Sequence, residues 1–350
     1  MSAQLIVKNC LKVLLISGIA WLPSCKDKTP DPVLIIRDTT ANSREVLIAN
    51  QGNFGWGEGT VSLYEAYSKT VQNDIYKSIN KESLGNVFQS VSRVGENYYF
   101  VINNSGKIVV TDINFTKKVE INGLNSPRYL YEVQPGKAYV TDLYAKAIAI
   151  VNLTTNTITG SIPTGTFTDK GVLRDGIFWC TAPDADKIYG INVLTDALVD
   201  SFSTGVNPDG IVVDKNNYIR ILCKGGGATN ALPILMSFTE ANGQKYPVGY
   251  TLSPIPTGLV YNSNLDILYF CTEKGIWRGT GDVQTGTAQL WIEAKGAIFY
   301  AIGIDPKNGD IYVSDVKDFV SKSTVKRYSS DGILLDEFIV GIIAGDFFFP

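Results

Sequence analysis

A short apolar segment recurs seven times along this chain of 350 residues. The first three positions are apolar or aromatic in every copy, and successive copies lie 39 to 53 residues apart; the copies are residues 46–50, 99–103, 138–142, 178–182, 221–225, 269–273 and 311–315. No segment between them shows the periodicity of an amphipathic helix. A repeat of about 40–50 residues made of short strands is typical of a β-propeller, with four strands in each blade. We therefore predict an all-β, seven-bladed β-propeller.

The two ends of the repeat region predict how the ring closes. The first copy, 46–50, has the character of a second strand, but no strand precedes it to form the inner strand of its blade. The chain ends in an apolar segment, 345–349, which has no hairpin partner after it. Pairing of the C-terminal segment with 46–50 would complete the first blade and remove two open sheet edges. Blade 3 shows the full set, with strands expected at 129–133, 138–142, 147–152 and 157–162.

Composition excludes several kinds of chemistry. Histidine is absent, which removes Ser-His-Asp and Cys-His catalysis and His-ligated zinc or haem. The net charge is −3 and no long basic run occurs, so nucleic-acid binding has no electrostatic support. We expect no cofactor, no metal site and no enzymatic activity. Cys180, Cys223 and Cys271 occupy one column of the repeat, too far apart for disulfides, and are expected to be buried thiols.

The N-terminus has the layout of a secretory signal. Lys8 and Lys12 precede an apolar run, 13–22, which is short for a membrane span. The run ends in Leu-Pro-Ser-Cys, and this sequence resembles a bacterial lipobox with Cys25 as the lipidated residue. We expect a signal peptide at 1–24, a tether at 25–44 and the propeller at 45–350. The chain would then be an outer-membrane lipoprotein at the cell surface, held to the membrane only by its lipid anchor. The alternative is an ordinary secretory signal with an incidental cysteine.

Several motifs resemble those of known propellers. Residues 139–142 (Tyr-Val-Thr-Asp) and 312–315 (Tyr-Val-Ser-Asp) are similar to the Tyr-Val-Thr-Asn (YVTN) repeats of YncE-like propellers. The stretch 49–55, followed by 59–64, and the ending 341–347 resemble DUF5074, a family of lipid-anchored Bacteroidetes propellers. The resemblance covers about residues 45–349. It implies a relation to the surface lipoprotein that captures cobalamin for a TonB-dependent outer-membrane transporter, and hence a role in nutrient uptake.

The first candidate binding set lies at the channel mouth. Loops from each outer strand to the next inner strand gather on one face of a propeller, and each contributes one residue to the rim. The expected rim residues are Asn86, Arg128, Lys170, Asp209, Thr257, Tyr300 and Asp346. This mixed set of two cations, two acids and three neutral groups suits a polar, hydrogen-bonding ligand. The alternative is that these side chains pair with one another and close the channel.

The second candidate set follows the second strands, whose ends lie on the same face. It comprises Asn50, Asn103, Asp142, Glu273 and Asp315, together with a glycine-rich loop that contains Gln51, Asn53, Phe54 and Trp56. Phe54 and Trp56 would stack on a flat ligand such as a corrin or a sugar. The alternative is that the loop folds onto its own aromatic side chains.

Three function classes remain open at this stage. The leading hypothesis is a ligand-binding lipoprotein that captures a nutrient, with a corrinoid as the named candidate, for a TonB-dependent transporter. The second is an adhesion or scaffold propeller that binds proteins through one face. The third is a metal-assisted hydrolase or lyase with Ca²⁺ held by carboxylates such as Asp142, Asp209, Glu273 and Asp315.

Overall fold

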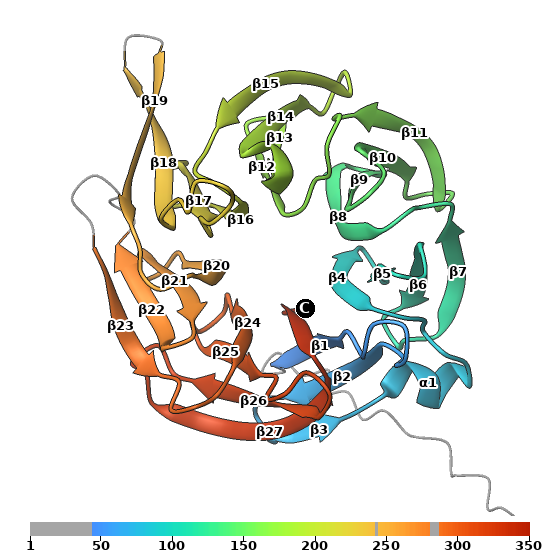
Figure 1. The fold of residues 1–350 in the computed structure, drawn as a ribbon. Helices are drawn as coiled ribbons and strands as arrows, with labels where there is room; N and C mark the ends of the chain where they lie inside the picture. The colour runs from blue at the N-terminus through green and yellow to red at the C-terminus, as the bar shows by residue number, and fades with distance from the viewer. Residues whose placement is uncertain (1–43, 242–243, 281–286) are drawn as a thin grey trace, which may run out of the picture. The chain divides into compact units, whose positions relative to one another are not determined.

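The computed structural model describes residues 44–241, 244–280 and 287–350. The expected signal peptide, Cys25 and the whole tether except Arg44 lie outside the described residues. Seven four-stranded antiparallel sheets are arranged in a ring around a central channel, which confirms the predicted seven-bladed β-propeller (Figure 1). Within the described residues, no helix is long and apolar enough to cross a membrane.

Each blade runs from an inner strand at the channel to an outer strand at the outer edge of the ring (Figure 1). The inner strands are β28 (Ala344–Phe348), β4 (Phe88–Val94), β8 (Pro127–Gln134), β12 (Gly171–Arg174), β16 (Pro208–Val213), β20 (Thr257–Asn262) and β24 (Phe299–Ile304). The second strands are β1 (Glu45–Asn50), β5 (Asn97–Ile102), β9 (Lys137–Asp142), β13 (Ile177–Ala182), β17 (Ile219–Cys223), β21 (Ile267–Thr272) and β25 (Ile311–Asp315). The seven repeated segments of the sequence therefore all belong to second strands.

The remaining strands complete the blades. The third strands are β2 (Thr60–Glu65), β6 (Lys107–Asp112), β10 (Ala147–Asn152), β14 (Lys187–Asn192), β18 (Ile234–Ala241), β22 (Gly275–Thr280) and β26 (Lys322–Tyr328). The outer strands are β3 (Thr70–Gln72), β7 (Lys117–Asn122), β11 (Thr157–Pro163), β15 (Ala197–Ser203), β19 (Gln244–Thr251), β23 (Ala288–Glu293) and β27 (Leu334–Ile342). The expected strands of blade 3 agree with β8 to β11 to within two residues at each end.

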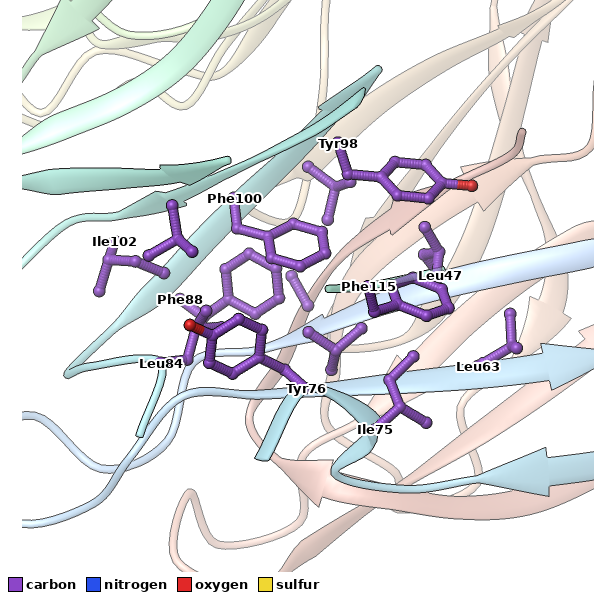
Figure 2. Packing of buried hydrophobic residues seen from close by; sticks show 14 residues of the cluster. Leu47, Leu63, Ile75, Tyr76, Leu84, Phe88, Tyr98, Phe100, Ile102 and Phe115 are labelled. Carbon is purple, nitrogen blue, oxygen red and sulfur yellow. The ribbon is translucent and has the colours of Figure 1, made fainter. Parts of the chain in front are cut away.

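The core lies between neighbouring blades. Second-strand residues alternate between the two sides of a sheet, and both sides are buried. In β1, Leu47 and Ala49 pack toward blade 2, whereas Val46 and Ile48 pack toward blade 7. Figure 2 shows the first of these interfaces, where Phe88, Phe100 and neighbouring apolar side chains fill the space between blades 1 and 2. Burial on both sides explains why the repeated segments are continuously apolar.

The C-terminal strand closes the ring as predicted. β28 pairs antiparallel with β1, with Ile48 opposite Phe347 and Leu47 opposite Phe348. The two phenylalanines point to opposite sides of the sheet, so Phe348 packs beside Tyr98 of blade 2 and Phe347 packs near Tyr312 of blade 7. The first blade therefore joins the two ends of the propeller through both hydrogen bonds and apolar contacts.

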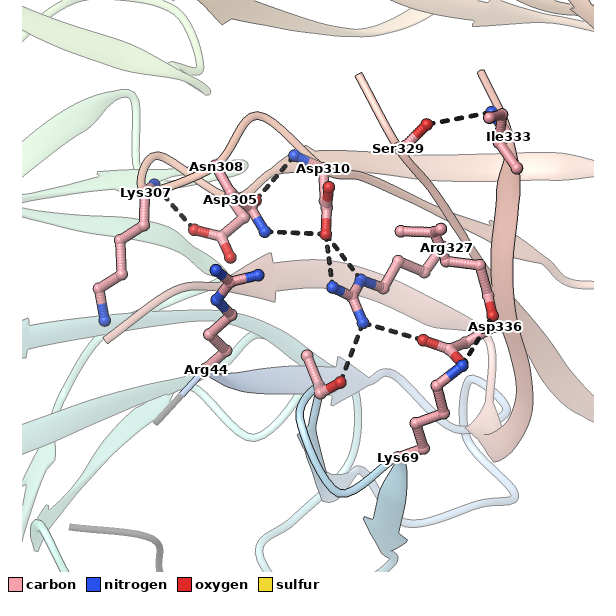
Figure 3. Close-up of polar contacts among 12 residues, drawn as sticks. Arg44, Lys69, Asp305, Lys307, Asn308, Asp310, Arg327, Ser329, Ile333 and Asp336 are labelled. Carbon is pink, nitrogen blue, oxygen red and sulfur yellow. Dashed lines mark hydrogen bonds and ion pairs between the residues drawn. The ribbon is translucent and has the colours of Figure 1, made fainter. Parts of the chain in front are cut away.

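A buried ionic cluster adds a second connection between blades 7 and 1. Arg327 of β26 donates to Asp310 at 2.6 and 2.8 Å and to Asp336 of β27 at 2.9 Å (Figure 3). The same guanidinium donates to the carbonyl of Ala66 in blade 1 at 3.1 Å. Tyr64, also of blade 1, donates its hydroxyl to Asp336 at 2.8 Å. The cluster therefore ties the last blade to the first outside the β28–β1 pair.

Two further expectations can be compared with the fold. Cys180, Cys223 and Cys271 are buried free thiols, as predicted. One short α-helix, α1 (Ile75–Asn80), lies between β3 and β4, where the sequence shows no amphipathic periodicity. Its Ile75 and Tyr76 are buried between blades 1 and 2, so this helix is stabilised by tertiary packing rather than by a periodic sequence.

Candidate functional site: the central cavity

The ring encloses a cavity of about 620 Å³ at the channel, lined mainly by inner strands. In a four-stranded antiparallel blade, each inner strand starts at the same end of the ring where the second strand finishes. Six of the seven expected rim residues line the cavity: Arg128, Lys170, Asp209, Thr257, Tyr300 and Asp346. The repeat pattern therefore predicted the position of these six side chains at the channel.

The seventh expected rim residue, Asn86, is misplaced by the prediction. Asn86 precedes β4 and does not line the cavity; Gln89 of β4 does so instead. The Asn86 side chain holds the loop that follows β1, because its amide donates to the carbonyls of Asn53 and Gly57 and its oxygen accepts from Gly55 N at 3.0 Å. Asn86 is therefore a loop anchor rather than a rim residue.

Irregular pairing at the inner strands shapes the lining. The register shifts near the start of six inner strands, namely β28, β4, β8, β16, β20 and β24. A β-bulge places two consecutive residues opposite one and re-aims their side chains. In β8, for example, both Arg128 and Tyr129 line the cavity. The bulges therefore give the mouth more polar side chains than one per blade.

Two of the three cations in the lining are paired with acids. Arg128 donates from Nε to Asp169 Oδ1 at 2.9 Å and from Nη1 to Gln89 Oε1 at 2.5 Å. Lys224 Nζ lies 2.7 Å from Asp209 Oδ1. Gln89, Asp169 and Lys224 were not among the expected site residues. Asp169 adjoins the predicted Lys170, and Lys224 directly follows the repeated strand β17, so both lay beside positions that the sequence pattern did identify.

Two acids of the lining, Asp209 and Asp346, differ in pKa. Burial acts to raise the pKa of Asp209, but Lys170, Lys224 and the Gly258 amide outweigh it and hold that pKa below its usual value. Burial raises the pKa of Asp346 to about 7, and the opposing effects of the Val91 amide and Lys170 are weaker. Asp209 is therefore a carboxylate at neutral pH, whereas Asp346 keeps its proton to a higher pH than an ordinary aspartate does.

The side chains that line the cavity differ between the start and the end of the inner strands. Polar side chains stand where the inner strands begin, and the later residues of the same strands are apolar, including Ile211, Val213, Ile302 and Ile304. Phe347 and Phe349 of the C-terminal segment also line the wall. Ile211, Val213, Ile302 and Ile304 also pack in the cores between neighbouring blades, so the surface that the cavity exposes is mainly polar.

The five predicted residues at the ends of the second strands do not line this cavity. Asp142 accepts hydrogen bonds from four backbone amides, those of Asn125, Ser126, Tyr144 and Ala145, and Asp315 accepts from two. Asn50 donates to Ser62 Oγ at 2.9 Å, and Asn103 donates to the carbonyl of Pro127 at 3.0 Å. Glu273 borders a separate depression beside Leu232 and Ile255. Asp142 and Asp315 therefore fix loops, Asn103 holds the start of β8, and Asn50 joins β1 to β2.

The glycine-rich loop of blade 1 is ordered by polar contacts and presents two aromatic residues. Gln51 lines the cavity, while Asn53 donates to the carbonyl of Phe319 in blade 7 at 2.7 Å. Phe54 is 72% exposed and Trp56 is 96% exposed, so the loop does not fold onto these side chains. Neither aromatic residue lines the central cavity. They form a separate surface, hereafter the aromatic loop.

The described part of the chain holds no group of three or more Cys, Asp or Glu side chains arranged to bind a metal ion. The carboxylates considered for Ca²⁺, which are Asp142, Asp209, Glu273 and Asp315, lie in four different blades. Asp209 is engaged by Lys224, and Asp142 and Asp315 by backbone amides.

Solved structures with the same fold are numerous and distant in sequence. A quinonprotein alcohol dehydrogenase-like protein from Bacteroides thetaiotaomicron is 15% identical, with a TM-score of 0.68 over 88% of this chain and 78% of that one. A putative 6-phosphogluconolactonase from Bacteroides fragilis is 12% identical, with a TM-score of 0.63 over 90% of this chain and 100% of that one. Virginiamycin B lyase from Staphylococcus aureus is 14% identical, with a TM-score of 0.56 over 71% of this chain and 82% of that one. At these identities the likeness shows the fold alone.

The search of curated proteins found no match. A family model does match, over residues 45–223, which is half of the chain and includes the aromatic loop and every strand of the first blade except β28. The chain therefore belongs to the DUF5074 family, described as a domain of unknown function.

Proposed function

We propose that this protein is a ligand-binding propeller without catalytic activity, whose central cavity takes a small polar molecule. The observation that carries the proposal is the cavity itself: about 620 Å³, within the usual range for small-molecule sites, with several polar side chains converging at one end. The alternative that the rim residues close the channel by pairing is disfavoured by that volume. Arg128 and Lys224 are paired, yet the space beside them stays open.

The proposal extends to the setting in which the ligand is bound. The Leu-Pro-Ser-Cys sequence at residues 22–25 supports lipidation at Cys25, and a tether of about 20 residues would hold the propeller at the outer membrane, on the cell surface. We propose that the protein captures a nutrient there and passes it to a TonB-dependent transporter. Labelling of the protein by radioactive palmitate, lost in Cys25→Ser, is the expected result for the anchor; equal labelling of both forms would contradict it.

A corrinoid is the named candidate ligand, and the geometry restricts how it would bind. A corrin ring with its amide side chains is larger than the drug-sized molecules that pockets of this volume enclose. It would have to rest across the mouth, within reach of the polar rim and of the aromatic loop. Replacement of Phe54 and Trp56 by Ala should then weaken corrinoid binding by more than about 1 kcal/mol.

The test of the general proposal is a thermal-shift and titration screen of the full chain. The panel contains sugars, nucleosides, amino acids, short carboxylates, cobinamide and cobalamin. A matched variant, Thr257→Trp, places a large side chain at the mouth. At least one compound should stabilise the wild type and fail to stabilise Thr257→Trp, with both proteins melting alike when unliganded. If no compound distinguishes the two proteins, binding in the central cavity is refuted.

A second candidate function rests on a different surface. Trp56 and Phe54 are held outward on a loop fixed by Asn86 and Asn53, and aromatic residues are enriched where proteins bind one another. A scaffold or adhesion propeller would use this surface with an empty channel. Trp56→Ala would then abolish partner binding while Thr257→Trp would not affect it.

A further inference from the structure

Three cations and three acids line the central cavity, so their formal charges balance; they are Arg128, Asp169, Lys170, Asp209, Lys224 and Asp346. Arg128 pairs with Asp169, at 2.9 Å between Nε and Oδ1. Lys224 pairs with Asp209, at 2.7 Å between Nζ and Oδ1. One cation and one acid of the lining are therefore left outside the two ion pairs.

These two charged groups, Lys170 and Asp346, are without an ionic partner among the described residues. No acceptor there stands within hydrogen-bond or ion-pair distance of Lys170 Nζ. Asp346 accepts from the amide of Val91 at 3.2 Å but contacts no cation in the same part of the chain. Burial raises the pKa of Asp346, and the charge of Lys170 opposes this effect through space, without contact. The cavity therefore separates two opposite charges that do not meet.

The backbone fixes both groups on opposite sides of the channel. Lys170 directly precedes β12 of blade 4, whereas Asp346 belongs to β28 of blade 1, across the ring (Figure 1). The Lys170 carbonyl accepts from Thr181 N at 2.8 Å, and Asp346 stands opposite Ala49 in the β28–β1 pair. A cation and an acid are therefore held at fixed positions around an open volume of about 620 Å³.

This arrangement selects the charge of a ligand. A molecule that fills the cavity displaces the water around Lys170 and Asp346, and burying a charge without a counter-charge is costly. An anion at Lys170 would leave Asp346 unpaired and repel it, and a cation at Asp346 would do the same to Lys170. An uncharged molecule would leave both groups unpaired. Only a ligand that carries one charge of each sign pairs with both.

We propose that the central cavity binds a small zwitterion of the amino acid class, with its carboxylate at Lys170 and its ammonium group at Asp346. Neutral side chains of the same lining can hydrogen-bond the rest of the ligand. Thr257 makes no side-chain hydrogen bond among the described residues, and the hydroxyl of Tyr300 makes only a long one, to Gln51 at 3.4 Å. This inference rests on the proposed function and names the class of ligand.

The test is isothermal titration of the full chain at pH 8, where Asp346 is mostly ionised because its pKa is about 7. The ligands are glycine, alanine, β-alanine, γ-aminobutyrate and ε-aminocaproate, which differ in the separation of their two charges. Each is compared with the carboxylate that lacks its amine and with the amine that lacks its carboxylate. At least one amino acid should bind about tenfold or more tightly than both of its analogues, since a hydrogen bond to a charged group contributes that much. If none does, the inference is overturned.

Two variants assign the ends of the ligand. Lys170→Met removes the cation, and the variant should melt like the wild type because the amine makes no contact among the described residues. Asp346→Asn removes the acid and keeps an acceptor for the Val91 amide. Each variant should bind the amino acid about tenfold or more weakly. Lys170→Met should bind the amine analogue as the wild type does, and Asp346→Asn should not weaken binding of the carboxylate analogue.

The matched control is Lys274→Met, which removes an exposed lysine from a loop at the same end of the ring and should alter no affinity. Unchanged binding of the amino acid in either Lys170→Met or Asp346→Asn would refute the inference.

The panel described for the proposed function separates the two levels of failure. If another compound binds the wild type and is blocked by Thr257→Trp while no amino acid binds, the zwitterion inference is wrong and the ligand-binding function stands. If neither an amino acid nor any other panel compound binds, both are wrong.

Discussion

Replacement of Arg327 by Met should destabilise the propeller by about 3 kcal/mol, because the change removes a cation shared by two buried acids. The Arg327 side chain is 7% exposed, and those of Asp310 and Asp336 are 9% and 8% exposed. Asp336 keeps Lys69 at 2.5 Å and the hydroxyl of Tyr64, whereas Asp310 keeps only the Asn308 amide at 2.9 Å. Asp310 therefore bears most of the cost, and the lower end of the range of 3–5 kcal/mol applies.

The assay is thermal and urea unfolding of the full chain. For a ring of this size, 3 kcal/mol corresponds to a decrease in Tm of about 5 °C. Lys69→Met is the matched control, because its amine contacts the same Asp336 but its side chain is 61% exposed, so its loss should cost under about 1 kcal/mol. If Arg327→Met is no less stable than Lys69→Met, the cluster does not stabilise the junction of blades 7 and 1.

Three further outcomes are expected. Deletion of residues 344–350 should prevent folding to a soluble monomer, because β1 and the inner edge of blade 1 lose their partner; a soluble, cooperatively unfolding product would contradict ring closure by β28. The pKa of Asp346 is about 7 in the folded protein, above the usual 3.8, so the folded state binds a proton that the unfolded state has released. The free energy of unfolding of the wild type should therefore fall as the pH rises from about 4 to 7, and Asp346→Asn should remove this dependence. A difference in free energy of unfolding between the two proteins that stays constant from pH 5 to 8 would refute it. Asn86→Ala should leave Tm within about 2 °C of the wild type but speed chymotrypsin cleavage at Phe54 or Trp56, and an unchanged cleavage rate would show that Asn86 does not hold the aromatic loop.

The fold was predictable because the apolar second strand of each blade recurs along the sequence. Second strands such as β5 are buried on both sides, so each contributes an uninterrupted apolar run that can be counted along the chain. Closure of the ring followed from one unpaired strand at each end. The helix α1 was not predictable, because six residues carry too little periodicity and its stability comes from burial of Ile75 and Tyr76 between two blades.

The site was only partly predictable, for two structural reasons. The connection that contains α1 makes the first repeat interval the longest, so the start of β4 could not be aligned with the other inner strands, and Asn86 was chosen where Gln89 belongs. Second, the β-bulges at the starts of the inner strands break the alternation from which side-chain direction is read. Tyr129 was missed for this reason, since strict alternation allows only one of the pair Arg128 and Tyr129 to face the channel.

Different strands stabilise the fold and line the mouth of the cavity, so ligand preference in this propeller can change without loss of the fold. The second strands supply the apolar contacts between blades, and Asp142 and Asp315 at their ends fix the loops through backbone amides. The residues at the mouth lie at the starts of the inner strands. Among the described residues, the side chains of Lys170 and Thr257 at the mouth make no hydrogen bond. Substitution at these two positions therefore alters the charge and width of the mouth at little cost in folding free energy. Selection on the ligand would act on such positions, whereas selection on stability would act on the repeated segments.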